Sequence, residues 1–205
     1  MRRLKNQSIL NSPNEYYRIF LERRNKEPDR MDLRRWHELV KPFKGGKLID
    51  VGCLDSLVPF IAVSKYPKAE VWGLDQSEKM VKKLADEYPE INYIVGDAYQ
   101  IQFPDVYFDY VVAGELIEHL EDPVKFFKEA FRILKPGGKL ALTTPKEEEP
   151  GGVDADRHLW SFNKEDIRCL AKPYMLGAYI KETPSWLERR IKYHHPYLLA
   201  IITKR

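Results

Sequence analysis

The chain has 205 residues, of which 43% are hydrophobic and 12% aromatic, so it is too apolar for a disordered chain and large enough for one packed core. Its 34 basic and 31 acidic side chains leave a formal net charge of only +3, so composition alone does not indicate a nucleic-acid or membrane binder. No apolar run approaches the roughly 20 residues that a membrane-spanning helix needs, and Met1–Gln7 lacks the apolar stretch of an export signal.

The N-terminal part of the chain is charged and has a helical pattern. Asn11–Val40 carries this pattern, with a break at Pro28. We expect residues 1–44 to form a helical cover and residues 45–205 to form an α/β core, together making a single domain over residues 1–205. Two cysteines, Cys53 and Cys169, are too few for a disulfide framework and too far apart for a zinc-ligand pair, which favours a cytoplasmic protein.

From Lys47 onward, short β-branched or aromatic runs alternate with helical stretches, which is typical of a parallel α/β sheet. The first five predicted strands are Lys47–Val51, Glu70–Leu74, Ile91–Val95, Phe108–Ala113 and Lys139–Thr143. The helices predicted between them are Leu57–Tyr66, Ser77–Tyr88 and Pro123–Leu134, with Pro67, Pro89 and Pro136 just beyond their ends. Two final strands, Gly177–Ile180 and Tyr197–Thr203, have no long crossover helix between them, so we expect an antiparallel pair at the end of the sheet.

Carboxylates follow four of the predicted strands, at the edge where open α/β sheets bind ligands. They are Asp50, Asp75, Asp97 and Glu115. We expect them to line an acidic crevice, which repels a pyrophosphate and attracts a ribose, an amine or a cationic sulfonium. A dinucleotide fingerprint would also need glycine at positions 52, 54 and 57, and only Gly52 is present. The electrostatics therefore favour S-adenosylmethionine over a nicotinamide dinucleotide.

The order and spacing of these motifs resemble the class I S-adenosylmethionine-dependent methyltransferases, in the ubiquinone-biosynthesis-type (methyltransferase type 11) branch. The motifs that carry the resemblance are Leu48–Cys53, Val71–Ser77, Gly96–Ala98, Phe108–Val112, Glu115–Leu120 and Leu134–Gly138. With the predicted elements, the resemblance implies a Rossmann-like α/β fold: a seven-stranded, mostly parallel sheet with helices on both faces and an antiparallel last strand. It implies an enzyme that uses S-adenosylmethionine and releases S-adenosylhomocysteine.

The resemblance also implies roles for particular residues. Gly52 and its neighbours would bracket the methionine part of the cofactor, Asp75 would hold the ribose hydroxyls, and Asp97 with Ala98 would contact the adenine. The candidate cofactor-binding residues are Asp50, Gly52, Cys53, Asp75, Gln76, Asp97, Ala98 and Glu115. Members of the family usually carry further glycines where this chain has Leu54 and Ser56, which predicts a stiffer loop with a less open approach to the cofactor.

A metal site is an alternative interpretation of the segment after the fourth strand. If a helical turn starts there, Glu115, Glu118 and His119 share one face and offer oxygen and nitrogen ligands to Mg²⁺ or Mn²⁺, and His158 supplies a fourth ligand. This arrangement resembles the small-RNA 3′-terminal 2′-O-methyltransferases. Their second histidine beyond the Arg-His pair is missing here, and Leu159 and Trp160 stand in its neighbourhood. The alternative interpretation is that Glu118 and His119 only order a turn over the site.

Methyl transfer from a sulfonium mainly needs proximity, and it needs a base only where the acceptor must lose a proton. His158 and His119 are the candidate bases. We expect the acceptor to be a small molecule, with oxygen slightly preferred as the acceptor atom. The basic and aromatic insert Thr183–His195 is suited to an anionic acceptor, and a nucleic acid is the less favoured partner. Two other hypotheses are a metal-dependent RNA 2′-O-methyltransferase and a non-catalytic protein on the same fold.

Overall fold

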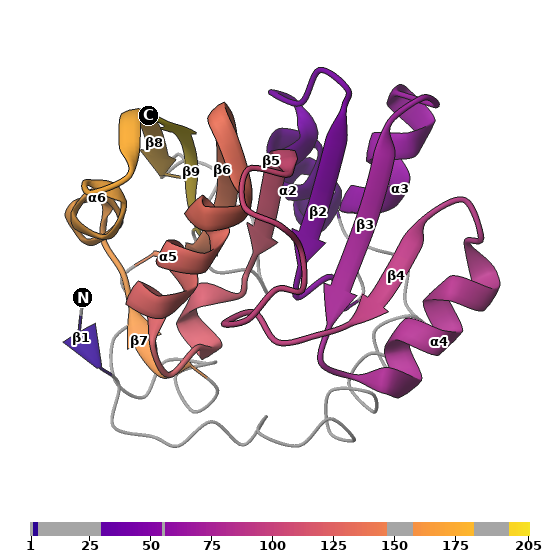
Figure 1. Ribbon diagram of the computed structural model, residues 1–205. Helices are drawn as coiled ribbons and strands as arrows, with labels where there is room; N and C mark the ends of the chain where they lie inside the picture. The colour runs from indigo at the N-terminus through magenta and orange to yellow at the C-terminus, as the bar shows by residue number, and fades with distance from the viewer. Residues whose placement is uncertain (1, 4–29, 55, 147–157, 183–196) are drawn as a thin grey trace.

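The computed structural model describes residues 2–3, 30–54, 56–146, 158–182 and 197–205, and Figure 1 shows how its elements are arranged. Seven strands form one sheet in the order β4-β3-β2-β5-β6-β9-β8. Their bounds are β2 (Lys47–Val51), β3 (Glu70–Asp75), β4 (Asn92–Val95), β5 (Phe108–Gly114), β6 (Leu134–Pro145), β8 (Met175–Glu182) and β9 (Tyr197–Lys204). A separate two-stranded sheet pairs β1 (Arg2–Arg3) with β7 (Trp160–Ser161).

The directions of the strands agree with the prediction. The strands β4, β3, β2, β5 and β6 run parallel, and β9 lies antiparallel between β6 and β8. The predicted seven-stranded, mostly parallel sheet with an antiparallel last strand is therefore confirmed. Because parallel strands end at the same edge, the residues after β2, β3, β4 and β5 come together at one side of the molecule.

Helices cover both faces of the sheet, as predicted. Their bounds are α2 (Arg30–Val40), α3 (Val58–Lys65), α4 (Glu78–Glu87), α5 (Pro123–Ile133) and α6 (Lys164–Ala171), with a 3-10 turn η1 (Ile117–His119). The helices α2, α3 and α4 pack on one face, and α5 and α6 pack on the other. In Figure 1, α2 lies behind the sheet and α5 in front of it. None of the helices described is long and apolar enough to cross a membrane.

Local sequence explains where the helices begin. The Ser77 hydroxyl accepts a hydrogen bond from the Met80 N–H at 3.4 Å, which caps the start of α4. Asn163 and Asp166 form a complete capping box at the start of α6. The helix α6 was not among the predicted elements, although this Asn-x-x-Asp pattern signals a helix start. The predicted helices match α3, α4 and α5 to within a residue or two at each end.

The start of β6 corrects one prediction. The sequence predicted that the strand begins at Lys139 and that Pro136 only stops the preceding helix. Instead, β6 begins at Leu134, directly after α5, and Leu134 pairs with Phe108 before the register shifts to the pair Tyr110 and Lys139. The residues between form an irregularity inside the strand, where a proline is tolerated. The predicted helix over residues 11–29 lies outside the described residues, as do residues 147–157 and the insert 183–195.

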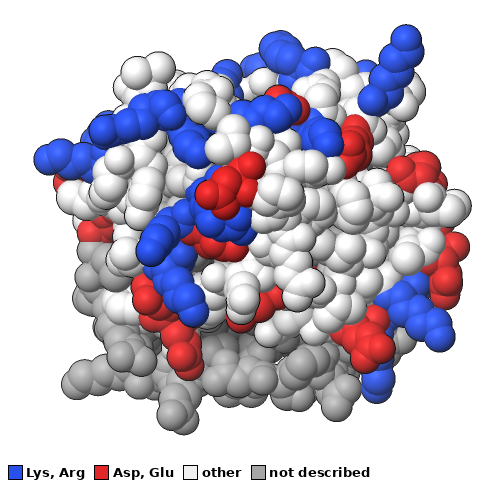
Figure 2. Space-filling view, viewed as in Figure 1, with Lys and Arg blue, Asp and Glu red and all other residues white. Residues whose placement is uncertain are grey.

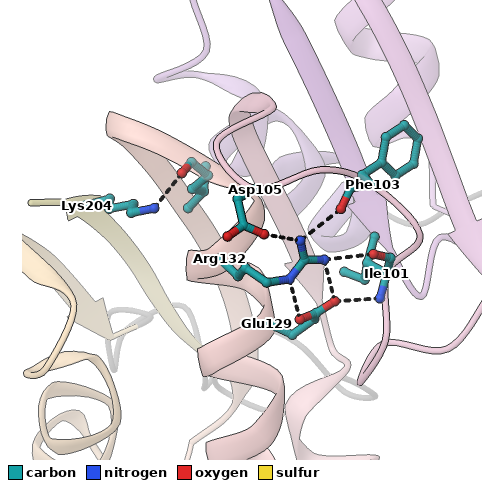
Figure 3. Close-up of polar contacts among 7 residues, drawn as sticks. Ile101, Phe103, Asp105, Glu129, Arg132 and Lys204 are labelled. Atoms are coloured by element: carbon teal, nitrogen blue, oxygen red, sulfur yellow. Dashed lines mark hydrogen bonds and ion pairs between the residues drawn. The ribbon is translucent and has the colours of Figure 1, made fainter.

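One arginine fastens the segment after β4 to α5 (Figure 3). The Arg132 guanidinium donates to the backbone oxygens of Ile101 and Phe103, at 2.8 Å each, and to Asp105 at 2.7 Å. It also forms a two-pronged pair with Glu129, whose carboxylate accepts the Ile101 N–H at 2.7 Å. These bonds hold in place the loop that begins with Asp97, at the edge where the strands end.

Candidate functional site

The first candidate site residue, Asp50, lies in β2 with 1% of its surface exposed. Its Oδ2 has no hydrogen-bond partner among the described residues. The pKa of Asp50 is raised to about 7. Burial raises the pKa most, the nearby charge of Asp75 also raises it, and the side-chain hydrogen bond with Ser56 lowers it. The structure therefore brings Asp50 and Asp75 together, as the predicted acidic crevice requires.

The turn after β2 needs a glycine for two reasons. Gly52 has a φ of +72°, which is unfavourable for residues with a side chain. A Cβ at this position would also lie 2.8 Å from Leu116 Cδ1, so the Leu116 side chain would have to shift. The N–H groups of Gly52 and Cys53 both donate to the Leu74 oxygen, at 2.8 and 3.0 Å. This turn therefore holds the chain tightly against β3 and leaves room for Leu116.

Asp75 ends β3 and organises the loop beside it. Its Oδ2 accepts the Leu54 N–H at 3.1 Å, and its Oδ1 accepts the Ser77 N–H at 2.9 Å. These two hydrogen bonds hold the carboxylate at the end of β3, beside the turn after β2. Leu54, which departs from the family's glycine pattern, is thus anchored through its backbone rather than through its side chain.

The other cofactor candidates differ in exposure. The Cys53 side chain is 1% exposed and packs with Met80 and Leu84, so its place in the cofactor site stays a prediction. Gln76 and Asp97 are exposed. Asp97 Oδ1 accepts the Tyr99 N–H at 2.8 Å, which shapes its own loop.

Glu115 has a partner that the sequence analysis missed. The Arg35 guanidinium of α2 lies 3.2 Å from the Glu115 carboxylate. Glu115 itself has a φ of +51°, a conformation that non-glycine residues adopt only where their surroundings hold them. Arg35 compensates one of the four carboxylates, so the edge is less acidic than predicted. No local signal distinguishes Arg35 from the other arginines of that helix.

The structure also brings together three of the four candidate metal ligands. Glu118, His119 and His158 place one ligand atom each within 4.8 Å of one another, and the two imidazole rings stand edge to face with centroids 4.8 Å apart. Glu115 is not part of this cluster, so the four-ligand hypothesis is corrected to three. The predicted helical turn over the segment is the short η1, which begins at Ile117 rather than at Glu115.

Glu118 is the buried member of this cluster, with 1% of its surface exposed. Burial raises the pKa of Glu118, the nearby Glu115 charge raises it further, and His158 lowers it. The Thr144 side chain also favours the ionised form, although neither Glu118 oxygen has a partner at hydrogen-bonding geometry among the described residues. Burial and a neighbouring carboxylate therefore outweigh the stabilising contacts.

Cavities and surface charge add little to the site. A shallow cavity of about 280 Å³ between α2 and α3 is lined by Arg34, His37, Glu38, Val40, Lys41, Ile61 and Lys65, and by none of the candidate carboxylates. On the face shown in Figure 2, basic side chains are interspersed with acidic ones rather than gathered on one surface. The described surface on this side thus lacks the continuous basic patch that a nucleic acid would favour.

Comparison with known proteins agrees with this geometry. Residues 49–142 match a family model described as a methyltransferase domain. The chain is 39% identical over 154 residues to the demethylmenaquinone methyltransferase of Lysinibacillus sphaericus (strain C3-41), a match that covers 72% of this chain. The chain spans 64% of that curated relative, which is less than two thirds of its length.

Two solved structures share the fold. The PH0226 protein of Pyrococcus horikoshii OT3 matches with a TM-score of 0.67 and 24% identity, over 93% of this chain and 99% of that one. Haemonchus contortus phosphoethanolamine N-methyltransferase 2, in complex with phosphomonomethylethanolamine and S-adenosylhomocysteine, matches with a TM-score of 0.68 and 21% identity, over 85% of this chain and 52% of that one. With the strand order and the motifs at the strand ends, these matches show that the chain contains a methyltransferase domain over residues 49–142 and has the class I methyltransferase fold, with sequence similarity to a demethylmenaquinone methyltransferase.

Proposed function

We propose that this protein transfers a methyl group from S-adenosylmethionine to a small-molecule acceptor at the edge formed by the ends of β2, β3 and β5. The observation that carries the proposal is the pair Asp50 and Asp75 on either side of the left-handed Gly52 turn. Buried Asp50 has a carboxylate oxygen without a partner among the described residues, so the pair suits a cationic ligand that also carries hydroxyl groups.

The residues of this edge divide the binding task. Asp75 is assigned to the ribose hydroxyls, because its carboxylate ends β3 and accepts the Leu54 and Ser77 N–H groups beside the Gly52 turn. Asp50 and Glu115 contribute negative charge toward the amine and the sulfonium. Asp97 and the half-buried Ala98 border the adenine, with Gln76 at the exposed rim. When bound, the cofactor supplies an activated methyl group, and the protein supplies position.

The proposed class of acceptor rests on the name of the similar demethylmenaquinone methyltransferase rather than on the geometry of the site. The relative is named for methylation of demethylmenaquinone, so a quinone-type small molecule is the first acceptor to test. The expectation that oxygen is the acceptor atom stays a prediction. Where the acceptor must lose a proton, His119 and His158 are the candidate bases, because their rings meet edge to face at the segment that follows β5.

Calorimetric titration with S-adenosylmethionine and S-adenosylhomocysteine tests the cofactor site. We expect micromolar affinity for the wild-type protein and no measurable binding for Asp75→Ala. Asp86→Ala is the matched control, since Asp86 is an exposed aspartate of α4. Failure of the folded wild-type protein to bind either ligand would support the non-catalytic alternative that Leu54 and Ser56 suggest.

A methyl-transfer assay tests the acceptor. Isotopically labelled S-adenosylmethionine is incubated with a short-chain demethylmenaquinone, supplied oxidised and reduced, and the product is analysed by mass spectrometry and NMR. A methyl group on a ring carbon or on a ring oxygen identifies the acceptor atom. Transfer to RNA but to neither quinone form would instead support the RNA 2′-O-methyltransferase alternative.

A further inference from the structure

We propose that Glu118, His119 and His158 form a binding site for one divalent transition-metal ion. Their ligand atoms lie within 4.8 Å of one another, although His158 is far from the other two in the sequence. Two imidazoles and one carboxylate are a donor set that binds Zn²⁺, Fe²⁺ or Mn²⁺ and leaves coordination positions open. The site rests on this geometry and does not depend on the proposed methyl transfer.

Glu118 is the observation that points to a ligand. Its side chain is buried among η1 and β6, with 1% of the residue exposed, and both carboxylate oxygens lack a hydrogen-bond partner among the described residues. A buried carboxylate in this state costs free energy unless hydrogen bonds or a cation satisfy its oxygens. A metal ion between Glu118 and the two imidazoles would satisfy it.

The backbone holds His158 in place beside η1. The Leu159 N–H donates to the Glu118 backbone oxygen at 2.7 Å. The Trp160 indole Nε1 donates to the Leu120 oxygen at 2.7 Å. Leu159 and Trp160, which replace the expected second histidine of the RNA methyltransferases, thus tie the two ligand-bearing segments together. Metal sites that are pre-organised in this way bind more tightly than sites on loose loops.

The distances are close to those of a filled site. Ligand atoms about 2.1 Å from a metal ion lie roughly 3 to 3.5 Å apart in tetrahedral or octahedral geometry. Side-chain rotations that move the ligand atoms by about 1 Å therefore bring all three close enough to coordinate one ion. The backbone arrangement that carries the ligands can stay as it is.

The position of the cluster suggests its use. Leu116, in the same segment, lies against Gly52, so the cluster adjoins the proposed cofactor edge. An open coordination position would bind an acceptor oxygen and lower the pKa of a hydroxyl there, so that the hydroxyl loses its proton to solvent without a protein base. This role, unlike the site itself, rests on the proposed function.

Titration of the untagged full-length protein with Co²⁺ and Zn²⁺ tests the site without an activity assay. We expect one Co²⁺ per chain, with the visible absorption bands of a four- or five-coordinate ion, and displacement of Co²⁺ by Zn²⁺. His158→Ala should weaken binding by more than about 100-fold, since even residues that only support a metal ligand are worth about 10- to 100-fold. The matched control is His37→Ala, because His37 is an exposed histidine of α2 outside the cluster.

Glu118→Gln keeps the size of the side chain and removes its charge, and circular dichroism shows whether each variant is folded. Unchanged Co²⁺ binding by folded Glu118→Gln and His158→Ala, or no binding by the wild-type protein, would overturn the metal site. Calorimetry with S-adenosylmethionine on the same samples keeps the two proposals separate. A protein that binds the cofactor but no metal ion would leave the proposed function standing, and the reverse result would leave only the metal site.

Discussion

The Arg35 guanidinium lies 3.2 Å from the Glu115 carboxylate, which joins α2 to the residue that follows β5. Both side chains are largely buried, with 19% and 26% exposed. The pair places a positive charge next to a carboxylate that we propose to face the cofactor. The pair therefore influences the ratio of the affinities for cationic S-adenosylmethionine and for S-adenosylhomocysteine, whose sulfur is uncharged.

Arg35→Met should raise the affinity for S-adenosylmethionine relative to S-adenosylhomocysteine by about fivefold. Removal of a positive charge near the sulfonium is worth roughly 1 kcal/mol where water screens the two charges. Calorimetry with both ligands measures the ratio. Arg34→Met is the control, because Arg34 is an exposed neighbour on the same helix. An equal change in both affinities would show that Glu115 does not face the sulfonium.

Gly52→Ala should destabilise the fold more than Gly137→Ala does. The two glycines have nearly the same positive φ, +72° and +76°, but a Cβ at Gly52 meets Leu116 Cδ1 at 2.8 Å whereas a Cβ at Gly137 has no atom within 4 Å. The backbone strain is thus common to both, about 1 kcal/mol, and steric overlap adds about 1 to 3 kcal/mol only at Gly52. Urea unfolding measures both. Equal losses would mean that Leu116 moves aside without cost.

Asp50→Asn should change the pH dependence of stability. The folded pKa is raised from 3.8 to about 7, so between these values folded Asp50 keeps a proton that the unfolded chain has released. The folded state then binds more protons, and the contribution of Asp50 to stability falls as pH rises from about 4 to about 7 and stays constant above that.

The Asp50→Asn variant has no titrating group at this position, so it does not lose this stability as pH rises. Its stability relative to wild type should increase by about 3 kcal/mol between pH 5 and pH 8, because one pKa unit corresponds to about 1.4 kcal/mol. Urea unfolding at several pH values gives the difference, and Asp86→Asn on the surface of α4 is the control. A constant difference between the Asp50 variant and wild type across this range would contradict the prediction.

Arg132→Lys should destabilise the fold by about 1.5 to 3 kcal/mol. A lysine ammonium cannot reproduce the planar fork that reaches Ile101, Phe103 and Glu129 together, and it leaves backbone oxygens without their donor. Arg168→Lys is the control, since Arg168 is 47% exposed and pairs only at 3.3 Å with Glu165. We expect that change to stay within about 0.5 kcal/mol. Equal effects in thermal or urea unfolding would show that Arg132 acts as a simple surface charge.

Elements set by local chemistry were predictable from the sequence. Short β-branched and apolar runs such as Lys47–Val51, which is buried from its second residue on, indicate strands. Ser77 marks the start of α4 through a hydrogen bond to the N–H three residues later. Parallel strands must end at one edge, so the placement of Asp50 and Asp75 followed from the strand assignment alone. The family motifs then indicated the cofactor, because they lie at these same strand ends.

Contacts between distant segments were decided only by the tertiary structure. The pairing of Arg35 with Glu115, the approach of His158 to Glu118, and the burial of the Cys53 side chain against α4 depend on how helices and loops pack on the sheet. The extension of β6 back to Leu134 depends on its pairing with Phe108 in β5. The sequence alone determined which residues reach the edge of the sheet, because periodicity and helix caps act within a few residues. The residues that contact or neutralise them were decided by strand register and by how the helices dock on the sheet.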